Sequence, residues 1–368
     1  MTRQASIKSC AMVAAGLVAT LLIAPAPAVA EVNFAGKKIQ IVVPAKEGGG
    51  LDRYARLLAP FFQKYLPGNP TVLVFNKPGG GTVKGSNWFQ RKAKPDGLIA
   101  MGVTTSVHTS FVFGGKKVKY DELGWRSVII SPLGTVFYAR TDTGVKGKDP
   151  VADVKVLQAG KWITSGKTPN SAELRMFLAL EMLGIKNVKP VFGISTVKRR
   201  QAIIRGEMQI GIDSAGAYIG KVTRYVKKGL IVPWMTLGFI EPSGKIVRDP
   251  LFPKLPSFPE VYQAVHGKAP SGRDWQMLKH LFNMGVMASK GIMLPKGTPD
   301  DVLAAWINAA KKAVKDPELL KLAKRDMGGY PHSFGAEADK VKVDAVGVTP
   351  ESKAWMRNWI DNVLKKKS

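Results

Sequence analysis

The chain alternates short apolar runs with stretches in which apolar residues recur every three or four positions. Residues 38–43 (KIQIVV), 71–75 (TVLVF) and 98–103 (LIAMGV) are apolar runs that predict buried strands. Between them, residues 52–65 and about 85–92 have helical spacing. Strand–helix–strand alternation at this spacing is typical of βαβ units, so we expect an α/β fold with a parallel sheet.

The same alternation returns after residue 150 and predicts a second α/β lobe. An Asn170–Glu173 pair is spaced to cap a helix, and the apolar run 230–238 could carry the chain back to the first lobe. We expect lobe 1 to comprise residues 31–132 with 236–368, and lobe 2 to comprise residues 133–235. The further strands are expected over residues 156–164, 188–192 and 208–212, and the further helices over residues 171–183, 196–205, 300–315 and 352–364.

The first thirty residues have the features of a secretory signal peptide. Arg3 and Lys8 precede an apolar run of about 14 residues, which is too short to span a bilayer comfortably. The run is followed by Ala28-Val29-Ala30, a small-x-small cleavage sequence. We therefore expect cleavage before Glu31 and a periplasmic mature protein.

The charge balance narrows the choice of partners. The 368 residues include 55 Lys and Arg against 27 Asp and Glu, a formal net charge of +28. So basic a chain favours anionic partners. One cysteine and four histidines argue against a disulfide framework and a Cys or poly-His metal centre, and no cofactor is expected. No nucleic-acid-binding module is recognisable. The basic cluster at residues 198–200 could steer anions, dock a partner or form a solvated helix face.

Two loops between a strand and a helix could bind an anion. They are residues 48–50 (GGG) and residues 165–170 (SGKTPN). Such loops direct free backbone N–H groups and the positive end of a helix dipole at one point. A P-loop is excluded because residues 80–86 lack its lysine, and a dinucleotide fingerprint is excluded because residues 79–84 lack its last glycine. Two such helix ends facing one another would suit a small dianion.

Polar residues follow two predicted strands at the edge where ligands of parallel sheets bind. Thr104, Thr105 and Ser106 could donate hydrogen bonds to a carboxylate or cap the next helix. His108 could donate to a carboxylate or fill the surface. Asp213 could cap a helix or meet a donor of the ligand.

Four motifs together resemble the substrate-binding proteins of tripartite tricarboxylate transporters, the TctC/Bug family. They occur in the family's order and spacing, and the similarity covers most of residues 37–336. The motifs are residues 41–56 (IVVPAKEGGGLDRYAR), 76–85 (NKPGGGTVKG), 95–97 (PDG) and 294–299 (LPKGTP).

The resemblance implies a two-lobed class II periplasmic-binding-protein fold that closes on a small carboxylated ligand and delivers it to a membrane permease. In the family, the first glycine loop and its counterpart in the other lobe bind a ligand carboxylate through backbone amides and waters. The chain departs from the family at Lys46, Glu47 and Leu51, in an expanded segment at residues 263–280, and in its strong positive charge.

We therefore expect a monomeric solute-binding protein, not an enzyme, that captures a di- or tricarboxylate, which could be aromatic. The alternatives are a basic envelope adaptor or ligand sensor on the same scaffold, and a hydrolase with a Ser or Asp beside a base. The residues expected to contact the ligand are Lys46, Glu47, Gly48, Gly49, Gly50, Thr104, Thr105, Ser106, His108, Thr164, Ser165, Gly166, Lys167, Asn170, Ser171 and Asp213.

Overall fold

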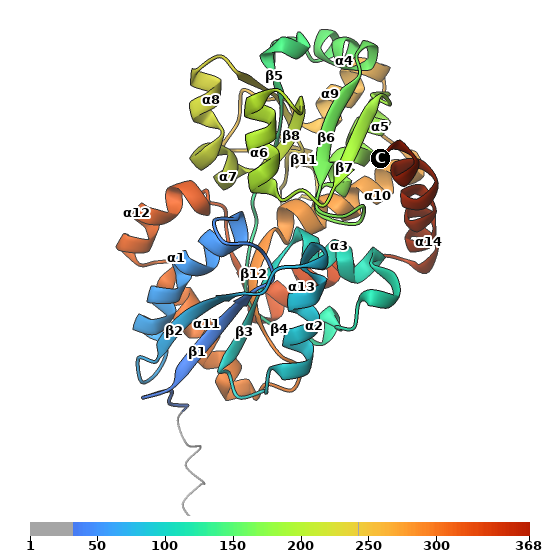
Figure 1. The fold of residues 1–368 in the computed structure, drawn as a ribbon. Coiled ribbons are helices and arrows are strands. Elements are labelled where there is room, and N and C mark those ends of the chain that lie inside the picture. Colours follow the sequence, from blue (N-terminus) through green and yellow to red (C-terminus); the bar gives the residue numbers. More distant parts are fainter. Residues whose placement is uncertain (1–31, 242) are drawn as a thin grey trace, which may run out of the picture. The chain divides into compact units, whose positions relative to one another are not determined.

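The computed structural model describes residues 32–241 and 243–368. The predicted signal peptide, residues 1–30, lies outside the described residues. The fold is mixed α/β with two lobes, as the sequence predicts (Figure 1). The lobe limits at residues 132–133 and 235–236 stay a prediction.

The first lobe is built on a six-stranded sheet in the order β13-β4-β12-β3-β1-β2. The parallel sheet expected from the sequence is only partly correct. Strand β1 pairs in parallel with β2 and β3, whereas β12 inserts antiparallel between β3 and β4. The strands are β1 Lys38–Val43, β2 Thr71–Asn76, β3 Ile99–Thr104, β4 Arg126–Ser131, β12 Lys290–Leu294 and β13 Ser333–Phe334.

Alternation along β1 explains why helices cover both faces of this sheet. Ile39, Ile41 and Val43 enter one apolar cluster with Trp306 of α11, while Val42 enters another. Strand side chains point alternately to opposite faces, so an almost continuous apolar run requires cover on both. The helices of this lobe include α1 Gly50–Tyr65, α2 Val83–Lys92, α3 Thr105–Phe113, α11 Asp300–Ala313, α12 Pro317–Asp326 and α13 Gly335–Val346.

The second lobe contains strands β5 to β9. Strand β5 pairs antiparallel with β8 and β9, and β6 pairs in parallel with β7. Strand β6 lies beside β8, and the Thr164 Oγ1 of β6 donates to the Ile210 carbonyl of β8 over 2.6 Å. The elements are β5 Thr135–Arg140, α4 Pro150–Ala159, β6 Trp162–Gly166, α5 Leu174–Met182, β7 Val188–Phe192, α6 Thr196–Arg205, β8 Ile210–Ser214, α7 Ala215–Lys221, α8 Thr223–Lys227 and β9 Ile231–Thr236.

Two sequence-based expectations for this lobe are wrong. Residues 156–159 end helix α4 instead of starting a strand, because Asp149 caps the backbone N–H groups of Val151 and Ala152. Asn170 does not cap α5, which starts at Leu174 with Glu173 at its N-cap and no side-chain cap bond. Strand β9 forms within the predicted apolar run 230–238 and pairs with β5 of this lobe.

The segment after β9 is more regular than its prolines and expanded length indicate. It forms the short hairpin β10 Phe239–Ile240 and β11 Ile246–Val247, then helices α9 Phe258–His266 and α10 Gly272–Phe282. The C-terminal segment contacts both lobes: Arg357 of helix α14, Pro350–Trp359, donates to the Val112 carbonyl of α3, and Lys367, beyond that helix, pairs with Glu181 of α5. Among the described residues, no helix has the length and hydropathy that a bilayer span requires.

Candidate ligand-binding cleft

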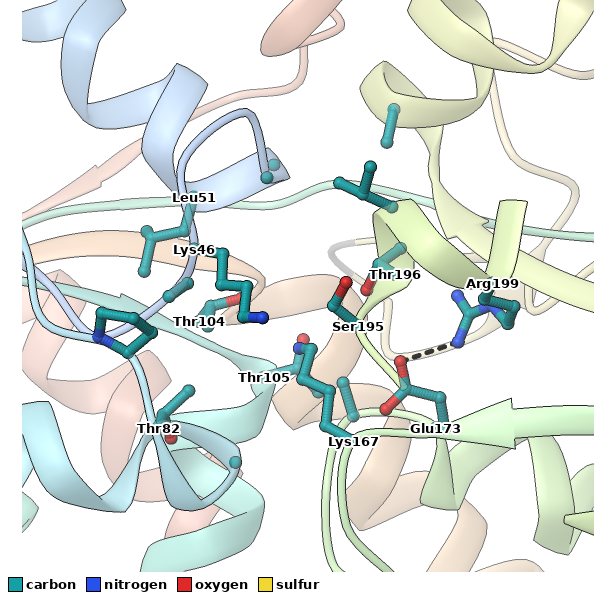
Figure 2. Close-up of a pocket in the computed structure, with 18 of the residues that line it drawn as sticks. Lys46, Leu51, Thr82, Thr104, Thr105, Lys167, Glu173, Ser195, Thr196 and Arg199 are labelled. Carbon is teal, nitrogen blue, oxygen red and sulfur yellow. Dashed lines mark hydrogen bonds and ion pairs between the residues drawn. The ribbon is translucent and has the colours of Figure 1, made fainter. Parts of the chain in front are cut away.

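A cavity of about 310 Å³ lies between elements of the two lobes (Figure 2). Its volume is at the lower end of the range for small-molecule sites. The first lobe contributes the glycine loop before α1, the loop before α2 and the start of α3. The second lobe contributes the loop after β6 and the starts of α5, α6 and α7. The site is therefore lined by both lobes.

Helix N-termini converge on this cavity. Gly49, Thr104 and Ser195 are the N-cap residues of α1, α3 and α6, and all three line the cavity. The first amides of a helix have no partner within the helix, and its N-terminus carries a partial positive charge. Convergence of several such ends from two lobes gives a site suited to a small anion.

The glycine loop before α1 is held by a buried carboxylate. Asp52 accepts hydrogen bonds from the Gly48 backbone N–H at 2.8 Å, from Arg56 Nε at 3.0 Å and from Asn76 Nδ2 at 2.9 Å. Because its carboxylate is fully engaged with these donors, Asp52 fixes the loop and leaves Gly49 and Gly50 on the cavity wall.

An ion pair buried in the second lobe forms part of the opposite wall. Arg199 Nη1 donates to Glu173 Oε1 over 2.8 Å, and both side chains are almost fully buried (Figure 2). Ser171 Oγ donates to the other Glu173 oxygen over 2.6 Å. Burial alone would raise the pKa of Glu173, but Lys167 and Arg199 outweigh it and lower this pKa to about 2. Glu173 is therefore a structural anion that holds Arg199 at the wall.

A second buried pair lies beside the first. Arg200 Nε donates to Asp213 Oδ2 over 3.1 Å, and the Tyr138 hydroxyl donates to the same oxygen over 2.9 Å. Asp213 lines the cavity but its carboxylate is engaged with these donors, and it does not cap the next helix, whose N-cap is Ser214. A helix-capping role for Asp213 is therefore wrong.

Cations outnumber anions around the cavity. Lys46, Lys167, Arg175 and Lys290 also line it, and none of these four described side chains has an ion pair with a carboxylate. Four lining side chains have a buried polar atom without a hydrogen-bond partner, and three of these atoms are guanidinium N–H donors: Thr168 Oγ1, Arg175 Nε, Arg199 Nε and Arg200 Nη2. The wall is short of acceptors, which an anionic ligand would supply.

The structure places seven of the sixteen predicted contact residues on the cavity wall. These are Lys46, Gly49, Gly50, Thr104, Thr105, Lys167 and Asp213. Ser106 lies just behind the wall, where its Oγ accepts from Lys167 Nζ at 3.0 Å and from the Ala172 backbone N–H at 3.2 Å. Ser106 therefore joins the two lobes at the base of the cleft.

The other predicted residues do not line the cavity, for identifiable reasons. His108 is fully buried, with its ring nitrogens against Glu122 and the Ala288 carbonyl. Glu47 and Gly48 lie on the exposed side of the loop. Thr164 turns inward to bond the neighbouring strand. The remaining non-lining residues are Ser165, Gly166, Asn170 and Ser171.

Sequence reasoning missed five charged wall residues. Glu173 and Arg175 belong to a helix whose start was misplaced, and Arg199 and Arg200 were assigned to a solvated or steering cluster. Lys290 opens an apolar strand far along the chain, and nothing in the local pattern marks it as facing a cavity. Within residues 32–241 and 243–368, no group of three or more His, Cys, Asp or Glu side chains is placed to hold a metal ion.

Comparison with known proteins gives one sequence relative and several folds of the same type. The chain is 25% identical to a UPF0065 protein of Bordetella bronchiseptica over 316 residues, which is 83% of each chain. No protein-family model matches the chain.

Solved structures match almost the whole chain at low identity. MatC from Rhodopseudomonas palustris with bound malate has a TM-score of 0.61 and 16% identity, covering 88% of this chain and 98% of that one. The periplasmic binding protein BugD has a TM-score of 0.61 and 18% identity, covering 90% and 97%. An R. palustris protein with adipate has a TM-score of 0.64 and 16% identity, covering 87% and 97%. The resemblance that the sequence motifs indicated is confirmed: the chain is similar over most of its length to a UPF0065 protein, and it shares the two-lobed fold of solved TctC/Bug solute-binding proteins.

Proposed function

We propose that this protein captures a small organic anion, a di- or tricarboxylate, in the periplasm and delivers it as a monomer to a tripartite tricarboxylate-type permease. The observation that carries the proposal is the charge of the cavity wall. Six Lys and Arg side chains line it against one Glu and one Asp, and both carboxylates are already paired with arginines. Such a wall favours a ligand that brings negative charge.

The cavity also indicates the type of acid. None of the described residues that line it is aromatic, so an aromatic ring would find no stacking partner. Its volume of about 310 Å³ suits a short aliphatic chain. Two of the structural neighbours were solved with malate and adipate, which are aliphatic dicarboxylates. These observations favour an aliphatic over an aromatic acid.

The alternatives fit the cleft less well. A basic adaptor for lipid or polysaccharide needs its cations on an open surface, whereas Arg175, Arg199, Arg200 and Lys290 are buried around a cavity. A hydrolase needs a nucleophile beside a free base, yet no histidine is among the described lining residues and the lining carboxylates are paired. A sensor that binds the same ligand without transport would share this cleft, and a test for a cognate permease separates it from a transporter.

The test is native mass spectrometry of freshly purified mature protein, followed by thermal unfolding with a panel of acids, amino acids and sugars. We expect a co-purifying acid that is recovered chemically unchanged, and a rise in unfolding temperature with di- or tricarboxylates, because a ligand that binds only the folded state stabilises it. A rise with amino acids or sugars alone would refute the proposal, and conversion of the acid would favour an enzyme.

A further inference from the structure

Lys290 is a buried cation of the cleft that has no counter-ion. It opens β12, in the middle of the first-lobe sheet between β3 and β4, and its side chain is 6% exposed. Its Nζ donates to Thr104 Oγ1 at 3.2 Å, to the Ser289 carbonyl at 3.1 Å and to Ser289 Oγ at 3.4 Å. All three acceptors are neutral, so the ammonium has hydrogen bonds but no counter-ion within bonding distance.

The groups around Lys290 are mostly positive. Arg175 faces it from α5, Lys167 from the loop after β6 and Arg53 from α1, while Asp213 of β8 is the opposing charge. That carboxylate is already shared between Arg200 and Tyr138. The start of α1 is also close, since a Cβ placed on Gly50 would lie 3.8 Å from Lys290 Cε. The positive end of the helix dipole therefore adds to the repulsion.

Arg175 is placed to share a ligand group with Lys290. Its guanidinium, which carries five N–H donors, makes one hydrogen bond among the described residues, from Nη1 to the Ala172 carbonyl at 3.0 Å. It belongs to the second lobe, whereas Lys290 belongs to the first, and both line the same cavity. An anionic group between them would give each cation its missing partner.

We propose that Lys290 and Arg175 form the subsite that binds one carboxylate of the ligand, and that Lys290 takes up a proton when this carboxylate binds. The subsite deepens the proposed function, since it presupposes that the cleft holds an organic acid. The subsite would add ionic side-chain contacts to the hydrogen bonds expected from the backbone amides of the glycine loop. It would also make the affinity for the ligand depend on pH.

The electrostatics of the empty cleft support this coupling. Burial, followed by the charges of Arg175, Lys167 and Arg53, lowers the pKa of Lys290 from 10.5 to about 7. A carboxylate beside the ammonium would reverse the effect of the neighbouring cations. Because the protonated form binds the acid, affinity should fall as pH rises above about 7.

The test uses two acids with the same five-carbon chain, glutarate and propane-1,2,3-tricarboxylate, which are both fully ionised above pH 7.5. Calorimetry at pH 8 in two buffers of different ionisation enthalpy measures proton uptake. We expect about 0.5 to 1 proton taken up per acid bound, and affinity about 10- to 30-fold weaker at pH 9 than at pH 7.5.

Three variants test whether Lys290 is the source of the proton uptake and of the pH dependence of binding. Lys290→Met should weaken binding and abolish both the proton uptake and the pH dependence. Lys290→Arg keeps a cation that does not titrate, so it should retain more affinity than Lys290→Met and also lose the pH dependence. Lys296→Met changes an exposed lysine of the same lobe outside the cavity, and both effects should persist.

Arg175→Gln probes the other half of the subsite. Removing this neighbouring charge should weaken binding and move the onset of the pH dependence to higher pH, because repulsion of the Lys290 ammonium is reduced. A variant that only disturbs folding would not shift that onset.

The outcomes distinguish the two proposals. If wild-type protein binds either acid with no proton uptake, or Lys290→Met keeps the pH dependence, the subsite is refuted and the proposed function stands. If wild-type protein binds neither these two acids nor any other acid of the panel, the proposed function fails and the subsite fails with it.

Discussion

Two regions of the cleft, the arginine pairs of the second lobe and the Lys290 region of the first, compensate buried positive charge differently. On the second-lobe wall, Arg199 and Arg200 are each paired with a buried carboxylate. On the first-lobe wall, Lys290 has only neutral hydrogen-bond partners, and the rest of that wall consists largely of glycine amides and threonine hydroxyls. Arg199 and Arg200 therefore have counter-ions without a ligand, whereas Lys290 of the first lobe and Arg175 of the second have none.

This difference shows which buried cations are compensated within the fold and which need a ligand to compensate them. Removing one partner of a buried ion pair leaves an uncompensated charge and destabilises the protein. Removing an unpaired buried ammonium relieves a cost in the empty state. Mutations at the arginine pairs and at Lys290 should therefore change stability in opposite directions, and the following predictions test this contrast from the largest effect to the smallest.

The largest effect is expected from Glu173→Gln, which leaves Arg199 buried without its counter-ion. We expect a loss of about 3–5 kcal/mol in the free energy of unfolding at pH 7, measured by denaturant titration. The pKa of Glu173 is lowered to about 2, so its stabilisation is present above its ordinary pKa and is lost as pH falls toward 2. The difference in free energy of unfolding between variant and wild type should therefore shrink below pH 4.5. A difference that does not change with pH would argue against the Glu173–Arg199 pair as its source.

Gly49→Val tests the backbone part of the first-lobe wall. Gly49 has φ −71° and ψ 167°, which any residue adopts, and a Cβ there would lie 3.1 Å from the Lys46 carbonyl oxygen. The fold should survive, but the branched side chain crowds the loop and the cavity, so glutarate affinity should fall about 10- to 100-fold. Calorimetry measures the loss, thermal unfolding serves as the control, and Gly49→Ala should have a smaller effect. Unchanged affinity would exclude this loop from the ligand contact.

Lys290→Met should stabilise the empty protein, in contrast to Glu173→Gln. A lysine whose pKa is lowered in the folded state destabilises it most below that pKa, and the cost disappears as pH approaches its unfolded pKa near 10.5. We expect added stability at pH 6 that shrinks to almost none at pH 10.5. Thermal unfolding across this range checks the trend, and a destabilised variant at pH 6 would mean that the ammonium is compensated.

The smallest effect is expected from the basic surface outside both walls. Outside the cavity wall, the segment from Met182 to Val232 holds eight Lys and Arg against one acidic residue, Glu207, and long-range attraction by exposed charges is screened by salt. The association rate of glutarate should fall a few-fold between about 20 and 200 mM NaCl in stopped-flow measurements. A rate independent of salt would show that this surface does not steer the ligand.

The sequence predicted most of the scaffold because its strands and glycine loops carry strong local signals. Residues 38–43, 188–192 and 196–205 form the expected elements at the expected limits. The antiparallel insertion of β12 was not predictable, because strand order depends on packing between segments far apart along the chain. Helix α4 was misassigned because its valines fit a strand, and the capping signal at Asp149 outweighed them.

The site residues also divide into those that the local sequence predicted and those that depend on contacts between distant segments. Lys46, Gly49 and Thr104 were found because they follow strands or precede helices, where local order points to a ligand edge. Lys290 and Arg175 could not be found, since each faces the cavity only after both lobes have folded. His108 is the opposite case. It follows a strand, as a ligand contact was expected to do, but its side chain is buried against Glu122 and does not line the cavity.

The contacts of the C-terminal segment with both lobes have a mechanical consequence. Arg357 bonds α3 of the first lobe and Lys367 pairs with α5 of the second, so the end of the chain connects the two lobes outside the cavity. Each is a single surface contact worth at most about 1 kcal/mol. The end of the chain therefore adds a weak resistance to any separation of these two helices.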